Sequence, residues 1–173
     1  MSDLTPSQTV GPFFSFGLCT EPTHLVVPAT TAGAVHIRGR VIDGAGNGVP
    51  DAMVEIRQAD AAGVYRGEFG WGRCGTDDDG AYEFLTVKPG VVANVPTRQA
   101  PHVNVLVFAR GLLKPLLTRM YFPDEDAANT ADAVLGAIGD AAERSALIAR
   151  GDGEDLRFDI YLQGPEQTTF FAL

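Results

Sequence analysis

The sequence predicts an all-β protein, an antiparallel β-sandwich, on three observations. Short runs rich in β-branched and aromatic residues alternate apolar and polar side chains, which is typical of strands with one buried face. Clusters of Gly, Asp and Asn separate these runs and favour tight turns. The 173 residues are 45% hydrophobic, which is enough for one substantial core, and no repeat or linker divides them. We therefore expect a single domain over residues 1–173.

The first 33 residues are predicted to form an extended arm and not a helix. Prolines recur along this segment, and it shows no helical periodicity. Apolar side chains nevertheless gather in it, namely Phe13, Phe14, Phe16 and Leu18. Because such side chains are costly to leave in water, the arm is expected to lie on its own domain or on another subunit.

Strands are predicted where the alternation is clearest. They are expected at 35–41, 51–58, 81–87, 102–108, 116–122, 156–163 and 168–173. Asp77–Gly80 has the acidic character of a calcium loop, but its acids do not stand at alternate positions and no closing Glu follows. We interpret it as a hairpin turn. Residues 124–150 are rich in Asp and Ala and contain Gly136 and Gly139, so short helical turns are expected there.

The composition argues against several classes of partner but leaves room for a local basic pocket that binds a small anion. The net charge of −9 argues against nucleic acid and against an anionic membrane. No apolar run reaches the ~18–20 residues of a membrane span. The polar first ten residues do not resemble a signal peptide, so we expect a cytoplasmic protein with reduced cysteines. Cys19 and Cys74 have no metal-ligand spacing, and a disulfide between them is the alternative.

The predicted strand 102–108 lies at the centre of the candidate site. Two polar residues, His102 and Asn104, interrupt its apolar run on one face, just after a Pro-rich loop. An unpaired buried polar group costs ~1–3 kcal/mol, so this is where an active site would lie. The other two histidines, His24 and His36, are interpreted as surface or capping residues. The sequence shows neither a nucleophile elbow nor a phosphate-binding loop.

Motifs along most of the chain resemble those of the intradiol ring-cleaving dioxygenase family. The resemblance begins at Thr5-Pro6-Ser7-Gln8-Thr9-Val10-Gly11-Pro12-Phe13 and includes Thr86-Val87-Lys88-Pro89-Gly90 and Ala100-Pro101-His102. Further matching segments are Gly39–Pro50, Val54–Ile56, Gln58–Asp60, Thr76–Phe84 and Thr118–Phe122, and the regions of Phe158 and Phe170–Phe171 fit the closing strands.

The resemblance implies a non-haem Fe(III) site made of two tyrosines and two histidines, ligands that suit ferric iron. By this resemblance, a tyrosine is expected where this chain has Val92, and a second histidine where it has Asn104. The other tyrosine is expected in an insertion that is shortened after Tyr65, which we do not interpret as a ligand. We therefore interpret Val92, His102 and Asn104 as a vestigial metal site. His102 is expected to be buried and hydrogen-bonded to the loop or to Asn104.

The resemblance further implies a non-metal α subunit whose partner, a paralogous β subunit, carries the Fe(III). The expected reaction opens protocatechuate with O2 to give 3-carboxy-cis,cis-muconate. This chain would form walls of the partner's substrate pocket with Thr9, Gly11, Pro12 and Phe13 of the arm, and with Arg110. Arg110 lies ~20 Å from Asn104 along an extended strand, so it could serve only a neighbour's site. The arm, residues 1–33, is then expected on the partner subunit.

Three alternatives remain open from the sequence. Arg110 could be an ordinary exposed charge at the end of a strand. The whole chain could be a non-catalytic β-sandwich binding or assembly module that is related to the family only by its core. It could also be a self-sufficient enzyme with rearranged ligands.

Overall fold

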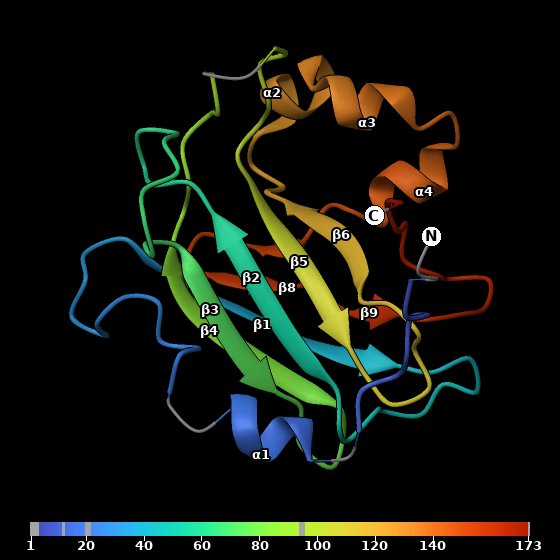
Figure 1. Ribbon diagram of the computed structural model, residues 1–173. Coiled ribbons are helices and arrows are strands. Elements are labelled where there is room, and N and C mark those ends of the chain that lie inside the picture. The colour runs from blue at the N-terminus through green and yellow to red at the C-terminus, as the bar shows by residue number, and fades with distance from the viewer. Residues whose placement is uncertain (1–3, 12, 20–21, 94–95, 173) are drawn as a thin grey trace.

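Two β-sheets face each other in a sandwich (Figure 1). The computed structural model describes residues 4–172 except 12, 20–21 and 94–95. One sheet has the strand order β4-β1-β8-β7, with β9 also pairing with β1, and the other has the order β3-β2-β5-β6. The strands are β1 (Ala34–Ile42), β2 (Met53–Gln58), β3 (Trp71–Gly75), β4 (Ala81–Val87), β5 (His102–Phe108), β6 (Leu116–Tyr121), β7 (Arg150–Asp152), β8 (Asp155–Arg157) and β9 (Ile160–Tyr161).

Alternation along single strands builds the core between the sheets. In β2, Val54 and Ile56 are buried between the sheets, while Glu55 and Arg57 are only partly buried on the other face. The largest cluster joins both sheets and includes Val41, Phe84 and Val107. A predicted all-β sandwich is therefore confirmed, and its pairs are antiparallel except for β1 with β8 and β1 with β9.

The short helices expected within 124–150 are confirmed. They are α2 (Asp126–Ala131), α3 (Ala133–Ala137) and α4 (Ala141–Ser145). Asp132 caps α3, because its side chain accepts hydrogen bonds from the backbone N–H groups of Val134 and Leu135. A second apolar cluster, formed by Ala100, Tyr121, Leu135 and Leu147, packs this helical segment against β6. None of the helices in the described ranges has both the length and the apolar character needed to cross a bilayer.

The arm departs from the predicted extended conformation. Its Phe14–Leu18 segment forms a short helix, α1, despite the neighbouring prolines. A later part of the arm lies on its own domain, since the backbone N–H of Val26 donates to the carbonyl of Leu85 at 2.9 Å and Val27 is buried. The aromatic part differs: the side chains of Phe13 and Phe16 are 76% and 75% exposed.

Two other predictions are wrong in detail. Residues 168–172 do not form a strand, because only Phe171 forms a bridge, with Leu117. The predicted strand 156–163 is divided into β8 and β9, and at the division the side-chain carboxylate of Asp159 accepts from the backbone N–H of Arg40 in β1. The strand β3 is not predicted, because its two glycines interrupt the apolar alternation.

The turn at Asp77–Gly80 joins the two sheets and is not a hairpin. It follows β3 in one sheet and precedes β4 in the other. The Asp77 carboxylate accepts hydrogen bonds from the backbone N–H groups of Asp79 at 3.0 Å and Ala81 at 2.8 Å. Asp77 therefore stabilises this turn through hydrogen bonds from the backbone. Both cysteines are free, and the Cys19 thiol lies over Gly75, next to Cys74 in β3.

Two loops that frame the start of β5 approach each other closely at Gly63. Gly63 has a φ of +76°, and a Cβ atom there would lie 1.9 Å from the carbonyl oxygen of Val91. We expect Gly63→Ala to lower the free energy of unfolding by about 2–4 kcal/mol, through left-handed strain and this clash. The control is Gly33→Ala, which has a φ of +69° but no atom within 4 Å, so only the strain applies. Urea unfolding measures both, and equal losses would contradict the close approach.

Candidate functional site

The antiparallel pairing register of β5 and β6 brings polar side chains together at one end of the sandwich. His102 pairs with Tyr121 and Asn104 with Arg119, and all four side chains lie on the face opposite the core. Tyr65 reaches them from the loop after β2, and Asp132 from the start of α3. We call these six residues the polar cluster: Tyr65, His102, Asn104, Arg119, Tyr121 and Asp132.

His102 is a buried, neutral histidine whose tautomer is fixed by its contacts. Its Nδ1 lies 2.8 Å from the carbonyl oxygen of Ala100, which can only accept, so Nδ1 carries the proton. Its Nε2 therefore accepts, and it lies 3.4 Å from the hydroxyl of Tyr65. Burial, followed by the charge of Arg119, lowers the pKa of His102 to about 4. The predicted bond from His102 to the loop is confirmed.

Asn104 connects Tyr65 to Arg119. Its Nδ2 donates to the Tyr65 hydroxyl at 2.9 Å and to the carbonyl of Arg57 at 3.3 Å. Its Oδ1 accepts from Nε of Arg119 at 3.0 Å. Because a guanidinium can only donate, Arg119 fixes which end of the amide faces Tyr65.

Tyr121 connects Arg119 to the buried Asp132. Its hydroxyl accepts from the Arg119 guanidinium at 3.4 Å and donates to Oδ1 of Asp132 at 3.3 Å. Burial raises the pKa of Tyr121 to about 12, against the lowering effect of Arg119. Oδ2 of Asp132 accepts from the backbone N–H of Ala100 at 2.8 Å. Asp132 thus joins the cap of α3 to the loop that precedes β5.

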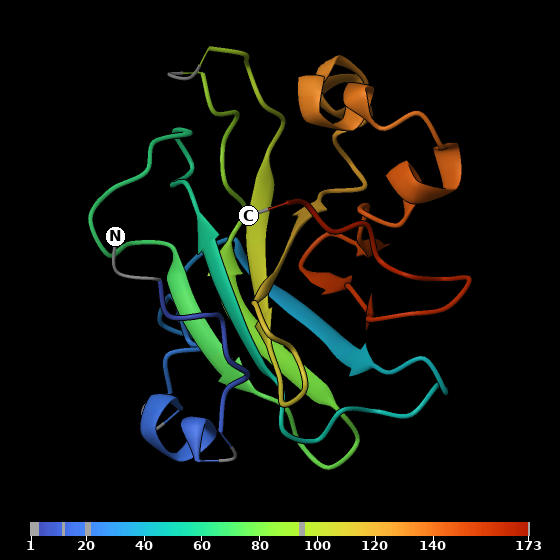
Figure 2. The same cartoon turned by 45° about the vertical axis from the view of Figure 1, so that its right-hand side comes forward.

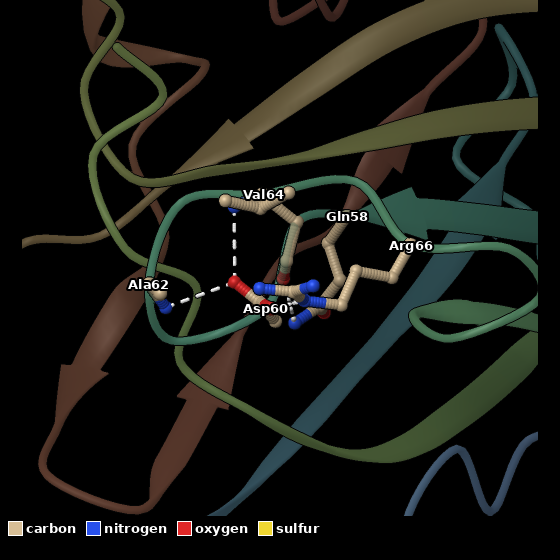
Figure 3. A network of polar contacts seen from close by, with 6 residues as sticks. Gln58, Asp60, Ala62, Val64 and Arg66 are labelled. Atoms are coloured by element: carbon tan, nitrogen blue, oxygen red, sulfur yellow. Dashed lines mark hydrogen bonds and ion pairs between the residues drawn. The ribbon is translucent and has the colours of Figure 1, made fainter. Parts of the chain in front are cut away.

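The loop that carries Tyr65 is held by Asp60 (Figure 3). Oδ1 of Asp60 accepts from the backbone N–H groups of Ala62 and Val64, both at 2.9 Å, and Oδ2 accepts from Nε of Arg66 at 2.5 Å. The bond from Arg66, followed by that from Val64, lowers the pKa of Asp60. The carbonyl of Asp60 also accepts from the backbone N–H of Gly90 at 2.9 Å, which joins this loop to the Lys-Pro-Gly loop.

The residues at this end of β5 do not fit the ferric iron that the family resemblance implies. Val92 is buried and offers no donor atom, and Asn104 directs its NH2 group at Tyr65. The Arg119 guanidinium adds a positive charge where a cation would bind. Within the described ranges, His, Cys, Asp and Glu side chains form no group of three that could hold a metal ion.

The predicted substrate-contacting residues lie at the opposite end of β5. The strand ends at Phe108, and Arg110 stands in the following turn, exposed and ion-paired through Nε with the carboxylate of Asp51. The backbone N–H of Gly111 donates to Oγ1 of Thr9 at 2.8 Å, so the arm passes beside this turn (Figure 2). The structure thus brings Thr9 and Arg110 together, far from the polar cluster.

Two other predicted arm residues, Gly11 and Phe13, lie just before α1. The carbonyl of Gly11 accepts from the backbone N–H of Phe14 at 3.2 Å, and the ring centroids of Phe13 and Phe16 are 6.1 Å apart. Pro12, also predicted to contact substrate, lies outside the described residues.

Sequence reasoning missed four members of the polar cluster. Tyr65 is not predicted to be a ligand, and the sequence pattern does not single out Arg119, Tyr121 or Asp132. Arg119 carried one usable signal, since a charged residue in the middle of a predicted strand needs a partner. Its pairing with Asn104 depends on the register, which the sequence alone does not specify.

A separate surface groove lies away from the polar cluster. A groove of about 930 Å³ over β1, β4, β7 and β8 is lined by arginines and acids, among them Arg38, Arg157 and Asp155. Arg38 pairs with Asp155 at 2.9 Å and Arg157 with Asp159 at 2.8 Å, so these charges are neutralised locally. The groove contains none of the predicted site residues.

Known proteins are similar to this chain in sequence and in fold. Residues 19–164 match the family described as Dioxygenase. The chain is 41% identical to the protocatechuate 3,4-dioxygenase alpha chain of Burkholderia cepacia, over 96% of each chain. It is 35% identical to the protocatechuate 3,4-dioxygenase beta chain of Burkholderia cepacia, over 76% of this chain and 65% of that one. The dioxygenase domain of a dioxygenase carbohydrate-binding protein fusion from Streptomyces sp. SirexAA-E superposes with a TM-score of 0.64 at 28% identity, covering 96% of this chain and 100% of that one.

The depressed pKa of His102 makes stability depend on pH. Its pKa is about 4 in the folded chain, whereas the ordinary value of 6.5 applies in the unfolded chain, so the unfolded chain binds this proton first as the pH falls. Stability from the neutral ring is present above about pH 6.5 and is lost on acidification to about pH 4. We expect this residue alone to account for a loss of ~3 kcal/mol between pH 7 and pH 4.

Urea unfolding of His102→Gln and wild type across this range measures the effect. The stability gap between the two proteins should narrow as the pH falls. His24→Gln is the matched control, because it removes a partly buried histidine outside the polar cluster. A gap that stays constant from pH 7 to pH 4 would contradict a buried neutral ring.

Proposed function

Because the chain belongs to the intradiol ring-cleavage dioxygenase family, we propose that it is the non-metal α subunit of an α/β protocatechuate 3,4-dioxygenase. The complete enzyme opens the protocatechuate ring between its two hydroxyl-bearing carbons, and both atoms of O2 enter the product, 3-carboxy-cis,cis-muconate. The observation that carries the proposal is the 41% identity to an alpha chain over 96% of both chains.

The family's Fe(III) belongs, in this proposal, to the partner β subunit. Support comes from the residues at the start of β5, where Val92 and Asn104 lack suitable donors and Arg119 supplies a competing charge. A β chain with 35% identity to this chain also exists in a related system, which fits a pair of paralogous subunits.

The α subunit is proposed to form part of the wall of the partner's substrate pocket, with Thr9, Gly11, Pro12, Phe13 and Arg110. A guanidinium suits the carboxylate of protocatechuate, since it offers paired N–H donors and a fixed charge. Two observations support this role: the arm is joined to the turn after β5 by the bond from Gly111 to Thr9, and the side chain of Arg110 is exposed. In this role the substrate carboxylate competes with Asp51, which pairs with Arg110 in the isolated chain.

The arm is proposed to pack on the β subunit. The exposed Phe13 and Phe16 lie close together, an arrangement that favours a protein contact. We also retain, as predictions, a single domain over residues 1–173 and a cytoplasmic location, with which two free cysteines are compatible.

Co-expression tests the proposal as a whole. The chain is produced with and without a β chain that has the complete ligand set, and ring cleavage is followed by loss of protocatechuate and uptake of O2. The pair should form a stable complex and cleave protocatechuate, whereas the chain alone should not. Neither complex nor cleavage would favour the non-catalytic binding module, and stoichiometric iron in the isolated chain would favour a self-sufficient enzyme.

Removing the charge of Arg110 should weaken substrate recognition in the complex. We expect Arg110→Ala to raise KM for protocatechuate about tenfold, with unchanged iron content, because a charge-assisted bond to the carboxylate is lost. Lys114→Ala is the matched control, since it removes another exposed cation from the same loop. Catechol lacks the carboxylate, so an equal KM increase for catechol would argue against this role.

Polar substitutions in the arm should weaken subunit association and leave the fold intact. Phe13→Ser/Phe16→Ser removes two largely exposed rings, so thermal unfolding of the chain should change little. Association with the β chain, measured by analytical ultracentrifugation, should weaken at least tenfold if the arm is a contact. Leu25→Ser, in the part of the arm that lies on β4, is the control. If the double variant associates with the β chain as tightly as the wild type does, the arm does not pack on the β subunit.

A further inference from the structure

We propose that Arg119 is a resident cation that takes the place of a metal in this chain and keeps the polar cluster metal-free. The inference deepens the proposed function and rests on it only for the division of labour between two subunits. It is carried by the geometry of Tyr65, His102, Asn104 and Arg119.

Two potential ligand atoms already stand at a metal-like separation. The Tyr65 hydroxyl and Nε2 of His102 are 3.4 Å apart. Two atoms that each lie ~2.1 Å from one metal ion, at a tetrahedral angle, are separated by about that distance. The Ala100 carbonyl orients the ring from its Nδ1 side, as an outer hydrogen bond commonly does for a metal-bound histidine.

Arg119 prevents residue 104 from acting as a third metal ligand. Residue 104 lies on the same face of β5 as His102, two residues along the strand. Its oxygen, the only atom of the amide suited to a metal, accepts from Nε of Arg119 at 3.0 Å. Its NH2 group consequently points at the Tyr65 hydroxyl, 2.9 Å away, and takes the place that a metal–phenol contact would need.

The charge of Arg119 acts in the same direction as its hydrogen bond. The guanidinium is permanently charged, and its positive charge disfavours a second cation beside His102. Within the cluster this charge is balanced by Asp132, to which Arg119 is connected through the hydroxyl of Tyr121. The cluster therefore already contains the positive charge that a metal would supply.

Asp132 does not depend on Arg119 for its own hydrogen bonds. Its carboxylate accepts from the backbone N–H groups of Ala100, Val134 and Leu135. Arg119→Gln is consequently a suitable test variant, because the carboxylate remains satisfied and the new amide can still donate to Asn104 or Tyr121.

The experiment compares metal uptake by the full chain in four forms: wild type, Asn104→His, Asn104→His/Arg119→Gln and Asn104→His/Arg119→Lys. Each is incubated with ferric citrate and, separately, with Co2+, then desalted. Metal is measured by mass spectrometry, ferric-phenolate binding by visible absorption, and folding by circular dichroism.

Only the glutamine double variant should hold about one metal per chain and develop ferric-phenolate colour. Asn104→His and the lysine double variant should retain less than a tenth as much, because both keep the positive charge. Equal uptake by Asn104→His and the glutamine variant overturns the proposal. Uptake by the lysine variant, or no uptake by a folded glutamine variant, also overturns it.

A second pair of variants, with the nearly isosteric Asn104→Asp, provides the test if histidine at position 104 prevents folding. Asn104→Asp/Arg119→Gln should bind Co2+ at least tenfold more tightly than Asn104→Asp, and equal affinities contradict the proposal. Ring cleavage by wild-type chain with the β chain is measured separately. Its absence would refute the proposed function, while the metal-uptake result on the single chain would stand.

Discussion

The antiparallel register between β5 and β6 is the constraint on which the candidate site depends. It sets His102 opposite Tyr121 and Asn104 opposite Arg119, while the alternate residues of both strands enter the core. A slip of one residue would exchange the two faces and bury polar groups among the valines of β5. The hydrophobic core therefore specifies the register, and the geometry of the polar cluster follows from the same pairing.

A buried polar cluster of this kind is stable only if its polar groups satisfy one another. Every contact in the polar cluster joins a donor to an acceptor, from Asn104 to Tyr65 and from Arg119 through Tyr121 to Asp132. With pKa values of about 4 and about 12, His102 and Tyr121 remain neutral near pH 7. The cluster is thus a connected network with one permanent cation, and removing a single member leaves others unpaired.

The β-sandwich and one face of the candidate site could be predicted from the sequence, because both depend on the alternation of apolar and polar residues along single strands. The pattern in β2 and β5 predicted their buried faces, and the shared parity of His102 and Asn104 identified the polar one. The loop that brings Tyr65 to them depends on hydrogen bonds to Asp60, and Arg119 arrives through strand pairing. Such non-local contacts leave no periodic trace in the sequence. The helix α1 was not predicted, because it is a single short element within a proline-containing arm.

The two ends of β5 have different roles in the proposed complex. His102 and Asn104 begin it at the polar cluster, whereas the turn after its last residue carries Arg110 and holds the arm through Thr9. In the proposed complex only this second end faces the substrate. Since β5 lies between β2 and β6, it also supports one whole sheet. In this proposal the pocket wall and the core both require β5, while Arg119 of the paired strand β6 takes the place of a metal beside its first residues.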